Sequence, residues 1–196
     1  MKNIAKMEKK TGKKWNSTKN PLLVSVRSGA AISMPGMMDT ILNLGLNEKT
    51  VEGFAEQTKN PRFSWDSYRR FIQLFGKVVF GVNDEKFDHV LDAAKEKQGV
   101  TDDSKLNVES LKTIVSKYKK ICEEHTKRKF PDTPNEQLVL SIEAVFKSWM
   151  GERAIVYREK NNITKDIANG TAVNVVTMVF GNMGDDSATG VVFTRN

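Results

Sequence analysis

The sequence predicts a mostly helical α+β fold in which a few β-strands flank a long helical segment. Between residues 47 and 157, apolar side chains recur at helical spacing, with capping residues ahead of several runs. A short apolar run at 22–26 is typical of a buried strand. Residues 171–180 are rich in valine and threonine, which favour strands. We therefore expect a strand and loop, then a helical insert, then further strands.

Length and composition set the class of protein. The chain has 196 residues, of which 39% are hydrophobic, enough for one domain with a subdomain. No apolar run approaches the roughly 20 residues of a membrane span. Cys122 is the only cysteine, which excludes an internal disulfide and fits a reducing cytosol. The net charge of +7 favours an anionic partner, either nucleotide phosphate or nucleic acid. We expect a cytoplasmic protein without a membrane segment.

The first part of the chain is predicted to contain a helix, a strand and a loop. Residues 1–10 form the end of an amphipathic helix that stops at Gly12. Because the opening residues carry no helix cap, we expect them to lie within a longer polypeptide. The strand at 22–26 is expected to end at Arg27, and a loop of small residues follows, with Gly29 and Gly36 in it.

The central part is predicted to be helical, with starts set by capping residues. Thr133-Pro134-Asn135-Glu136 is a capping box with proline at the first helical position. The other starts are placed by Asn47, Ser64, Asp84 and Asn107. Gly99 is expected to end one helix, and Gly151 to interrupt the last before a short continuation at 154–159.

The last part is predicted to be a β-hairpin. Residues 171–180 and 188–194 form its two strands, joined by a polar turn at 181–187. The chain then divides into a partial nucleotide-binding lobe (1–46), a helical insert subdomain (47–157) and the hairpin of the same lobe (158–196).

Arg27 is the leading candidate for a functional side chain. Its guanidinium is a permanently charged planar fork that suits phosphate oxygens, and the small residues after it allow a ligand close to the backbone. A surface arginine at a strand end, followed by an ordinary turn, explains the same residues. Asp39 is the one carboxylate in this loop, and either holds a metal–nucleotide complex or caps the following turn. The two histidines, His89 and His125, are too far apart to indicate a metal site.

Several blocks of sequence resemble one known family. They are SVRSGA at 25–30, MPGMMDTILNLG at 34–45, AIVYR at 154–158, MVFGN at 178–182 and TGVVFTRN at 189–196. In this order they resemble the nucleotide-binding domain of the pyruvate, phosphate dikinase family, and they bracket nearly the whole chain.

The resemblance implies an ATP-grasp-like fragment, in a fold whose two α+β lobes clamp ATP. It implies a parent enzyme that converts ATP, phosphate and pyruvate to AMP, pyrophosphate and phosphoenolpyruvate with Mg²⁺. A histidine on another domain carries the phosphoryl group, and the parent is expected to be a homodimer. The remaining domains of the parent are then the partners of this chain, with no role for nucleic acid or a membrane. We expect the fragment alone to be inactive.

The same resemblance implies roles for individual residues. Arg27 matches the arginine that contacts the ATP phosphates, and such a charge stabilises the transition state of phosphoryl transfer. Backbone groups of Thr177, Met178 and Val179 match the strand that meets the adenine edge, and Met38 flanks the nucleotide. The family's upstream glycine-rich element with a phosphate-binding lysine has no counterpart before residue 21. The family pattern also has a basic residue at the position of Ala31 and a glycine at that of Ala188.

An alternative from another class is a standalone module whose basic helices hold nucleic acid or a protein partner. Its basic residues include Lys117, Lys119, Lys120, Lys127, Arg128 and Lys129. Salt-dependent binding of DNA or RNA favours the module. Nucleotide binding that is lost on changing Arg27 favours the dikinase family.

Overall fold

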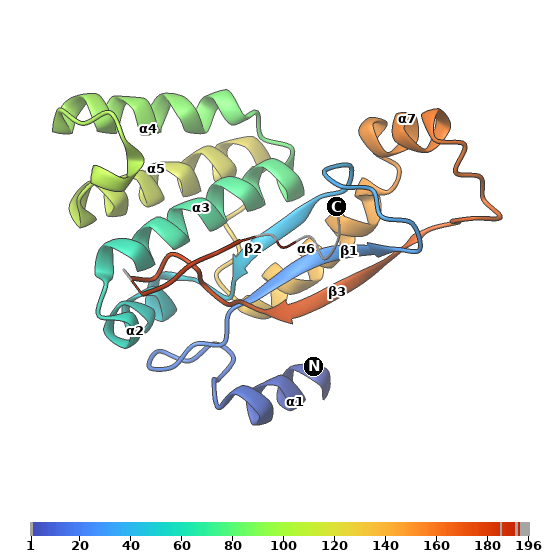
Figure 1. Cartoon of the computed structure of the whole chain (residues 1–196). Coiled ribbons are helices and arrows are strands. Elements are labelled where there is room, and N and C mark those ends of the chain that lie inside the picture. The colour runs from blue at the N-terminus through green and yellow to red at the C-terminus, as the bar shows by residue number, and fades with distance from the viewer. Residues whose placement is uncertain (1, 185, 191, 193–196) are drawn as a thin grey trace.

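The computed structural model describes residues 2–184, 186–190 and 192. In these residues the fold is mixed α/β and mostly helical, with one three-stranded sheet (Figure 1). The helices are α1 (Lys2–Thr11), α2 (Glu48–Thr58), α3 (Pro61–Phe80), α4 (Asp84–Gln98), α5 (Val108–Thr126), α6 (Pro134–Ser148) and α7 (Glu152–Lys160), with a short 3₁₀ turn, η1 (Asp103–Lys105). The strands are β1 (Val24–Ala30), β2 (Thr40–Leu44) and β3 (Thr171–Thr177).

The sheet has the order β2-β1-β3, and both pairs are antiparallel. The central strand β1 places Arg27 opposite Thr40 on β2 and opposite Asn174 on β3. A bulge interrupts the β1–β2 ladder, and Asn43 has a positive φ of 60° there. The side-chain amide Nδ2 of Asn43 donates to the carbonyl oxygen of Ser67 on α3 at 3.2 Å, which ties the bulge to the helices.

One face of the sheet forms the core of the molecule. Val24, Val26 and Ile41 are fully buried, and α6 packs across all three strands. Helix α3 contacts both β2 and α6, so that the helical part joins the sheet along its β2 side (Figure 1). On the opposite face of the sheet, Arg27 and Asn174 are exposed. We call the latter the open face.

The helical part is held by aromatic packing between α3, α4 and α5. The rings of Phe71 and Phe75 lie 6.1 and 5.4 Å from that of Phe130, which follows α5. Tyr118 of α5 packs edge-on against Phe87 of α4, and its hydroxyl donates to the Phe87 carbonyl oxygen at 3.0 Å. These contacts extend the sheet's core into the helices.

Most of the helix starts expected from the sequence are confirmed, but the one at Ser64 is wrong. Asn60 is the N-cap of α3, its side chain accepting from the amide of Phe63 at 3.0 Å, and Pro61 takes the first helical position. Ser64 lies inside the helix, fully buried, with its hydroxyl 3.1 Å from that of Thr58. A local Asn-Pro signal therefore outweighs the serine that follows it.

Two expectations about the strands are also wrong. Strand β1 does not end at Arg27 but continues to Ala30, because β3 supplies hydrogen-bonding partners along its whole length. Where the structure describes the expected hairpin, it is not seen: β3 pairs with β1, and residues 186–190 and 192 contain no strand. Residues 191, 193 and 194 of its second arm lie outside the described residues. Phe180 leaves the sheet, and its ring packs 5.3 Å from that of Phe54 and 5.2 Å from that of Phe63.

Candidate functional site

Arg27 lies in the middle of the central strand and projects from the open face. Pairing with Thr40 and Asn174 fixes its backbone from both sides. The guanidinium Nε donates to the hydroxyl of Ser25 at 3.2 Å, so the side chain leans back along its own strand. Hydrogen bonds to the strands on both sides fix the backbone of Arg27, so the position from which its side chain projects is well defined.

The small residues after Arg27 serve the sheet itself. A Cβ at Gly29 would lie 2.5 Å from Nδ2 of Asn174, so a larger residue here would require this exposed asparagine side chain to move. The Gly29 amide donates to the hydroxyl of Thr171 at 3.1 Å. The side chain of Asn174 thus lies over Gly29, in the space expected to admit a ligand, and no local pattern in the sequence indicates this contact.

Thr177, Met178 and Val179 lie where β3 ends, beside the start of β1. Thr177 is opposite Val24, and the Met178 amide donates to the Leu23 carbonyl oxygen at 2.9 Å. Val179 has left the ladder, and its side chain is 88% exposed. Thr177 and Arg27 are three ladder positions apart on neighbouring strands, which at the rise of a strand is about 10 Å. The two groups of candidate residues thus share one sheet, separated along the strand direction.

Met38 and Asp39 lie in the loop of residues 31–39 that joins β1 to β2. Met38 is half-buried, and the Asp39 carboxylate accepts from Nη2 of Arg153 on α7 at 2.9 Å. The Asp39 amide donates to the hydroxyl of Ser148 at 3.2 Å. Nothing in the sequence singled out Arg153, because an arginine in a helix rich in charged residues carries no local signal of its long-range partner.

The described residues contain cavities but no metal-binding cluster. A cavity of about 660 Å³ lies between the C-terminal ends of α3 and α5 and helix α6; Asp39 lines it, but Arg27 does not. A second, of about 470 Å³, lies between α3, α4 and Leu42 of β2. In the described part of the chain, no group of three or more His, Cys, Asp or Glu side chains is arranged to hold a metal ion.

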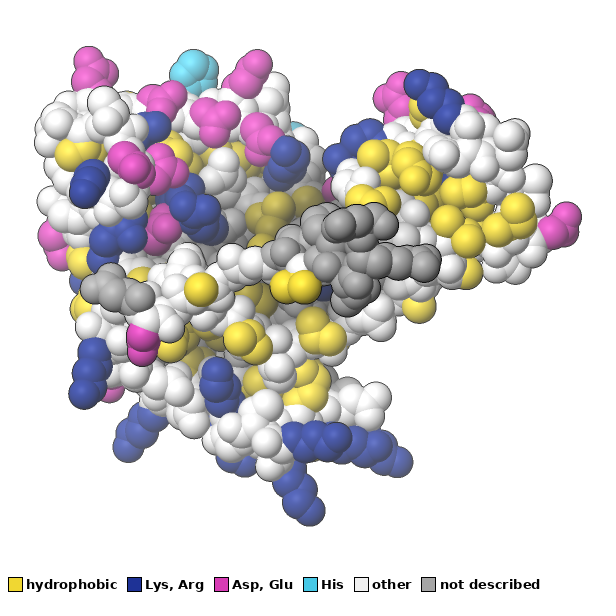
Figure 2. All heavy atoms as spheres, in the orientation of Figure 1, with side chains coloured by type: hydrophobic (Ala, Val, Ile, Leu, Met, Phe, Trp, Pro, Cys, Tyr) yellow, Lys and Arg dark blue, Asp and Glu magenta, His cyan; other side chains and the backbone are white. Residues whose placement is uncertain are grey.

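The charged surface of the helical part is mixed in sign. Figure 2 shows Lys, Arg, Asp and Glu side chains interspersed over α3–α5, while lysines gather on and around α1. Lys119 of the proposed basic helix is engaged by two carboxylates, those of Glu48 and Asp132, at 3.0 and 3.1 Å. No described helix is long and apolar enough to span a membrane.

Comparison with known proteins places this geometry in a family. Residues 1–196 match the family described as "Pyruvate phosphate dikinase, AMP/ATP-binding domain". Proteins named pyruvate, phosphate dikinase from Entamoeba histolytica and Giardia intestinalis are 56% and 55% identical over 195 and 193 residues, which is 100% and 98% of this chain and 22% of each relative. The relative from Arabidopsis thaliana, named "Pyruvate, phosphate dikinase 1, chloroplastic", is 52% identical over 97% of the chain and 19% of its own length.

The chain therefore spans about a fifth of the length of the curated relatives that it matches. These matches do not support the alternative of a standalone nucleic-acid or protein-binding module. Because a relative is named chloroplastic, the cytoplasmic location stays a prediction. With its full length matched by the family and its sequence more than half identical to several members, the chain belongs to the pyruvate, phosphate dikinase family, in the AMP/ATP-binding domain.

Proposed function

We propose that this chain binds ATP on the open face of its sheet, as part of an ATP-grasp fold. In this proposal Arg27 contacts the phosphates and the backbone of Thr177–Val179 meets the adenine edge. Met38, in the loop beyond β1, flanks the nucleotide. The observation that carries the proposal is the exposed Arg27 on the central strand, fixed by pairing on both sides, in a chain whose family is described as AMP/ATP-binding.

The arrangement of these residues suits an extended nucleotide. Arg27 and Thr177 are about 10 Å apart along adjacent strands, so one ligand can reach both only if its base and phosphates lie at opposite ends. Val179 lies beyond the end of β3 and is exposed, so its backbone groups can be offered to a ligand.

The chemistry follows from the charge of Arg27. During phosphoryl transfer, negative charge spreads over the transferred oxygens, and a fixed guanidinium stabilises it without reorganising. Mg²⁺ bound with ATP neutralises phosphate charge in such reactions. Because the described residues contain no group of three metal-ligating side chains, we assign no magnesium ligand to them.

The activity of the whole enzyme is a proposal that concerns a longer polypeptide. We propose that a protein containing this chain, as a homodimer, converts ATP, phosphate and pyruvate to AMP, pyrophosphate and phosphoenolpyruvate through a phosphohistidine on another domain. The 196-residue chain alone is then expected to form no phosphoenolpyruvate. Turnover by a purified sample free of host enzyme would contradict this expectation.

Calorimetric titration of the chain with MgATP tests the binding proposal. Arg27→Ala should weaken or abolish binding, and Arg27→Lys should restore it only in part, because lysine keeps the charge but loses the planar fork. Arg128→Ala is the matched control, since Arg128 is exposed at the far end of α5 and its loss removes the same charge. Equal affinities for the Arg27→Ala and Arg128→Ala proteins would overturn the proposal.

A further inference from the structure

The loop of residues 31–39 is attached to helix α7 by a single side chain. Arg153 donates through Nη2 to the Asp39 carboxylate at 2.9 Å and through Nη1 to the Gly36 carbonyl oxygen at 3.3 Å. Gly36 has a φ of +73°, a conformation that favours glycine, so its carbonyl oxygen is presented by a turn. One guanidinium thus spans two positions of the loop, as its forked geometry allows.

Helix α7, which carries Arg153, is itself held in place. Ala154, next to Arg153, is fully buried. Arg158 of the same helix lies 4.1 Å above the ring of Trp149 and donates to the Trp149 carbonyl oxygen at 2.8 Å, which holds α7 against the end of α6. The hydroxyl of Ser148, also at the end of α6, accepts from the Asp39 amide at 3.2 Å. The loop is therefore held at two points, by Arg153 of α7 and by Ser148 of α6, and both lie near the α6–α7 junction.

We propose that Arg153 is a positioning residue for the nucleotide-binding loop. It anchors residues 31–39 to the α6–α7 junction, and so sets where Met38 lies relative to Arg27. This inference rests on the proposed nucleotide binding, and it gives Asp39 the role of an anchor for Arg153 and not of a metal ligand. Arg153 acts through the loop and does not touch the nucleotide.

The contact is modest in strength, which suits positioning and not overall stability. The side chains of Arg153 and Asp39 are 63% and 28% exposed, and ion pairs of this kind contribute little to unfolding free energy. Their loss should therefore loosen the loop locally, by about two- to fivefold in its opening equilibrium, while the domain stays folded.

Hydrogen exchange and nucleotide titration on four variants test the proposal. Arg153→Gln and Asp39→Asn each remove one partner, and the double variant Asp39→Arg/Arg153→Asp reverses the pair. Lys160→Gln is the control, because Lys160 is exposed on the same helix and its loss removes the same charge. In the single variants, the backbone amides of residues 31–34 and 36–38 should exchange about two- to fivefold faster, and MgATP binding should weaken by a similar factor. The reversed pair should recover much of the slow amide exchange and much of the MgATP affinity. The control should match the unsubstituted chain in both measurements.

Three results would overturn the proposal. They are unchanged exchange in the single variants, faster exchange with unchanged MgATP affinity, and no recovery in the reversed pair. If the unchanged chain binds no MgATP, the nucleotide function fails separately, and the exchange rates still decide whether Arg153 anchors the loop. A thermal unfolding midpoint that falls as steeply in Arg153→Gln as in a core variant would show a structural role instead.

Discussion

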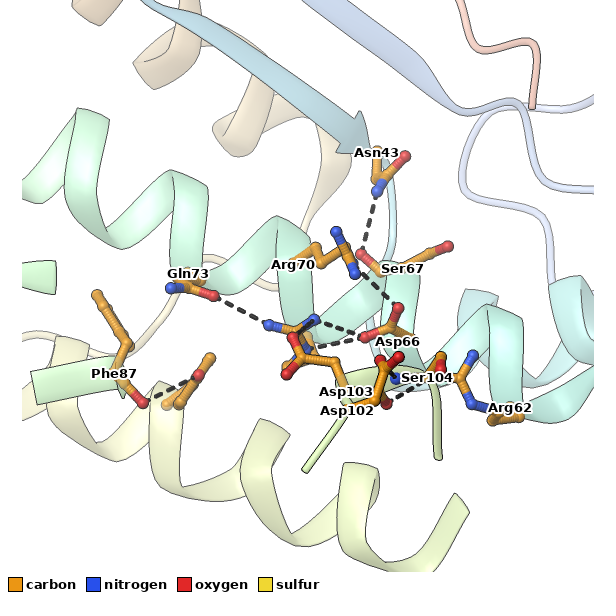
Figure 3. A network of polar contacts seen from close by, with 12 residues as sticks. Asn43, Arg62, Asp66, Ser67, Arg70, Gln73, Phe87, Asp102, Asp103 and Ser104 are labelled. Atoms are coloured by element: carbon orange, nitrogen blue, oxygen red, sulfur yellow. Dashed lines mark hydrogen bonds and ion pairs between the residues drawn. The ribbon is translucent and has the colours of Figure 1, made fainter. Parts of the chain in front are cut away.

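Replacing Asp66 by alanine should destabilise the protein more than replacing any exposed carboxylate. Asp66 on α3 accepts from Nε and Nη2 of Arg69 at 2.9 and 2.7 Å. It also accepts from Nε of Arg70 at 3.0 Å (Figure 3). The Arg69 side chain is only 3% exposed. Its remaining partners are Gln73 at 3.1 Å and Asp103 of η1 at 3.5 Å. The substitution therefore leaves a buried guanidinium without its principal counter-charge.

The expected magnitude follows from that burial. Removing one partner of a buried ion pair costs about 3–5 kcal/mol, because the other charge stays desolvated and loses its main counter-charge. Of the carboxylates that the structure describes, only the more distant one of Asp103 remains here. For a domain of this size, each kcal/mol lowers the thermal midpoint by about 2–4 °C. Asp66→Ala should thus lower the midpoint by about 6–20 °C. Asp92→Ala is the matched control: Asp92 is 69% exposed and pairs with Lys95 at 2.8 Å, and such pairs contribute at most about 1 kcal/mol.

Thermal unfolding followed by circular dichroism measures both shifts. The double variant Asp66→Leu/Arg69→Met removes both charges at once and should recover a large part of the loss, since apolar replacements of a buried pair are often neutral or stabilising. The reasoning is wrong if Asp66→Ala shifts the midpoint no more than Asp92→Ala. It is also wrong if the double variant is less stable than Asp66→Ala.

Three further predictions concern packing and ionisation. Gly53→Ala should destabilise α2 despite alanine's higher helix propensity, because its Cβ would lie 1.9 Å from the Thr18 carbonyl oxygen; a rise in the urea midpoint would contradict this. Burial raises the pKa of Tyr118 and of Cys122 to about 12 and that of Tyr68 still further, so the unfolded chain loses these protons first. The free energy of unfolding should therefore fall as pH rises above about 9, by up to about 1.4 kcal/mol per pH unit for each group that ionises in the unfolded chain. In urea titrations at several pH values, the free energy of unfolding of Cys122→Ala should fall less steeply with pH. The buried Cys122 thiol should react with iodoacetamide at pH 8 only after denaturant is added, and rapid labelling of the folded chain would refute this.

The helices could be predicted because their boundaries depend on nearby residues. Asn47 accepts from the Thr50 amide at 2.9 Å, and Thr133 accepts from the Glu136 amide at 3.3 Å, as the capping patterns indicate. The wrong helix start at Ser64 also has a local cause, since Asn60, followed by Pro61, carries a stronger start signal four residues earlier.

The strand pairing could not be predicted in the same way. β1 pairs with β3 across the entire helical segment, and no local pattern states which strand is its neighbour. β2 carries no clear strand signal in the sequence, because the bulge at Asn43 interrupts the alternation that marks strands. Extended segments close in sequence suggested a hairpin, whereas the sheet is built from distant ones.

In the candidate site, too, locally signalled residues could be predicted and their distant partners could not. Arg27 could be singled out from the sequence as a charged side chain beside small residues, although those residues continue the strand to Ala30 where a loop was expected. The family resemblance of the chain is confirmed. The contact partners Asn174 and Arg153 lie far along the chain, and only the folded structure places them beside Gly29 and Asp39.

The central claim is that a nucleotide lies along the sheet between Thr177–Val179 and Arg27. Amide chemical-shift changes on titrating the isotope-labelled chain with MgATP test it most directly. The account predicts the largest changes at residues 26–28 and 177–179, and their loss in Arg27→Ala. Changes centred instead on the cavity between α3, α5 and α6, or on the basic residues 117–129, would contradict it.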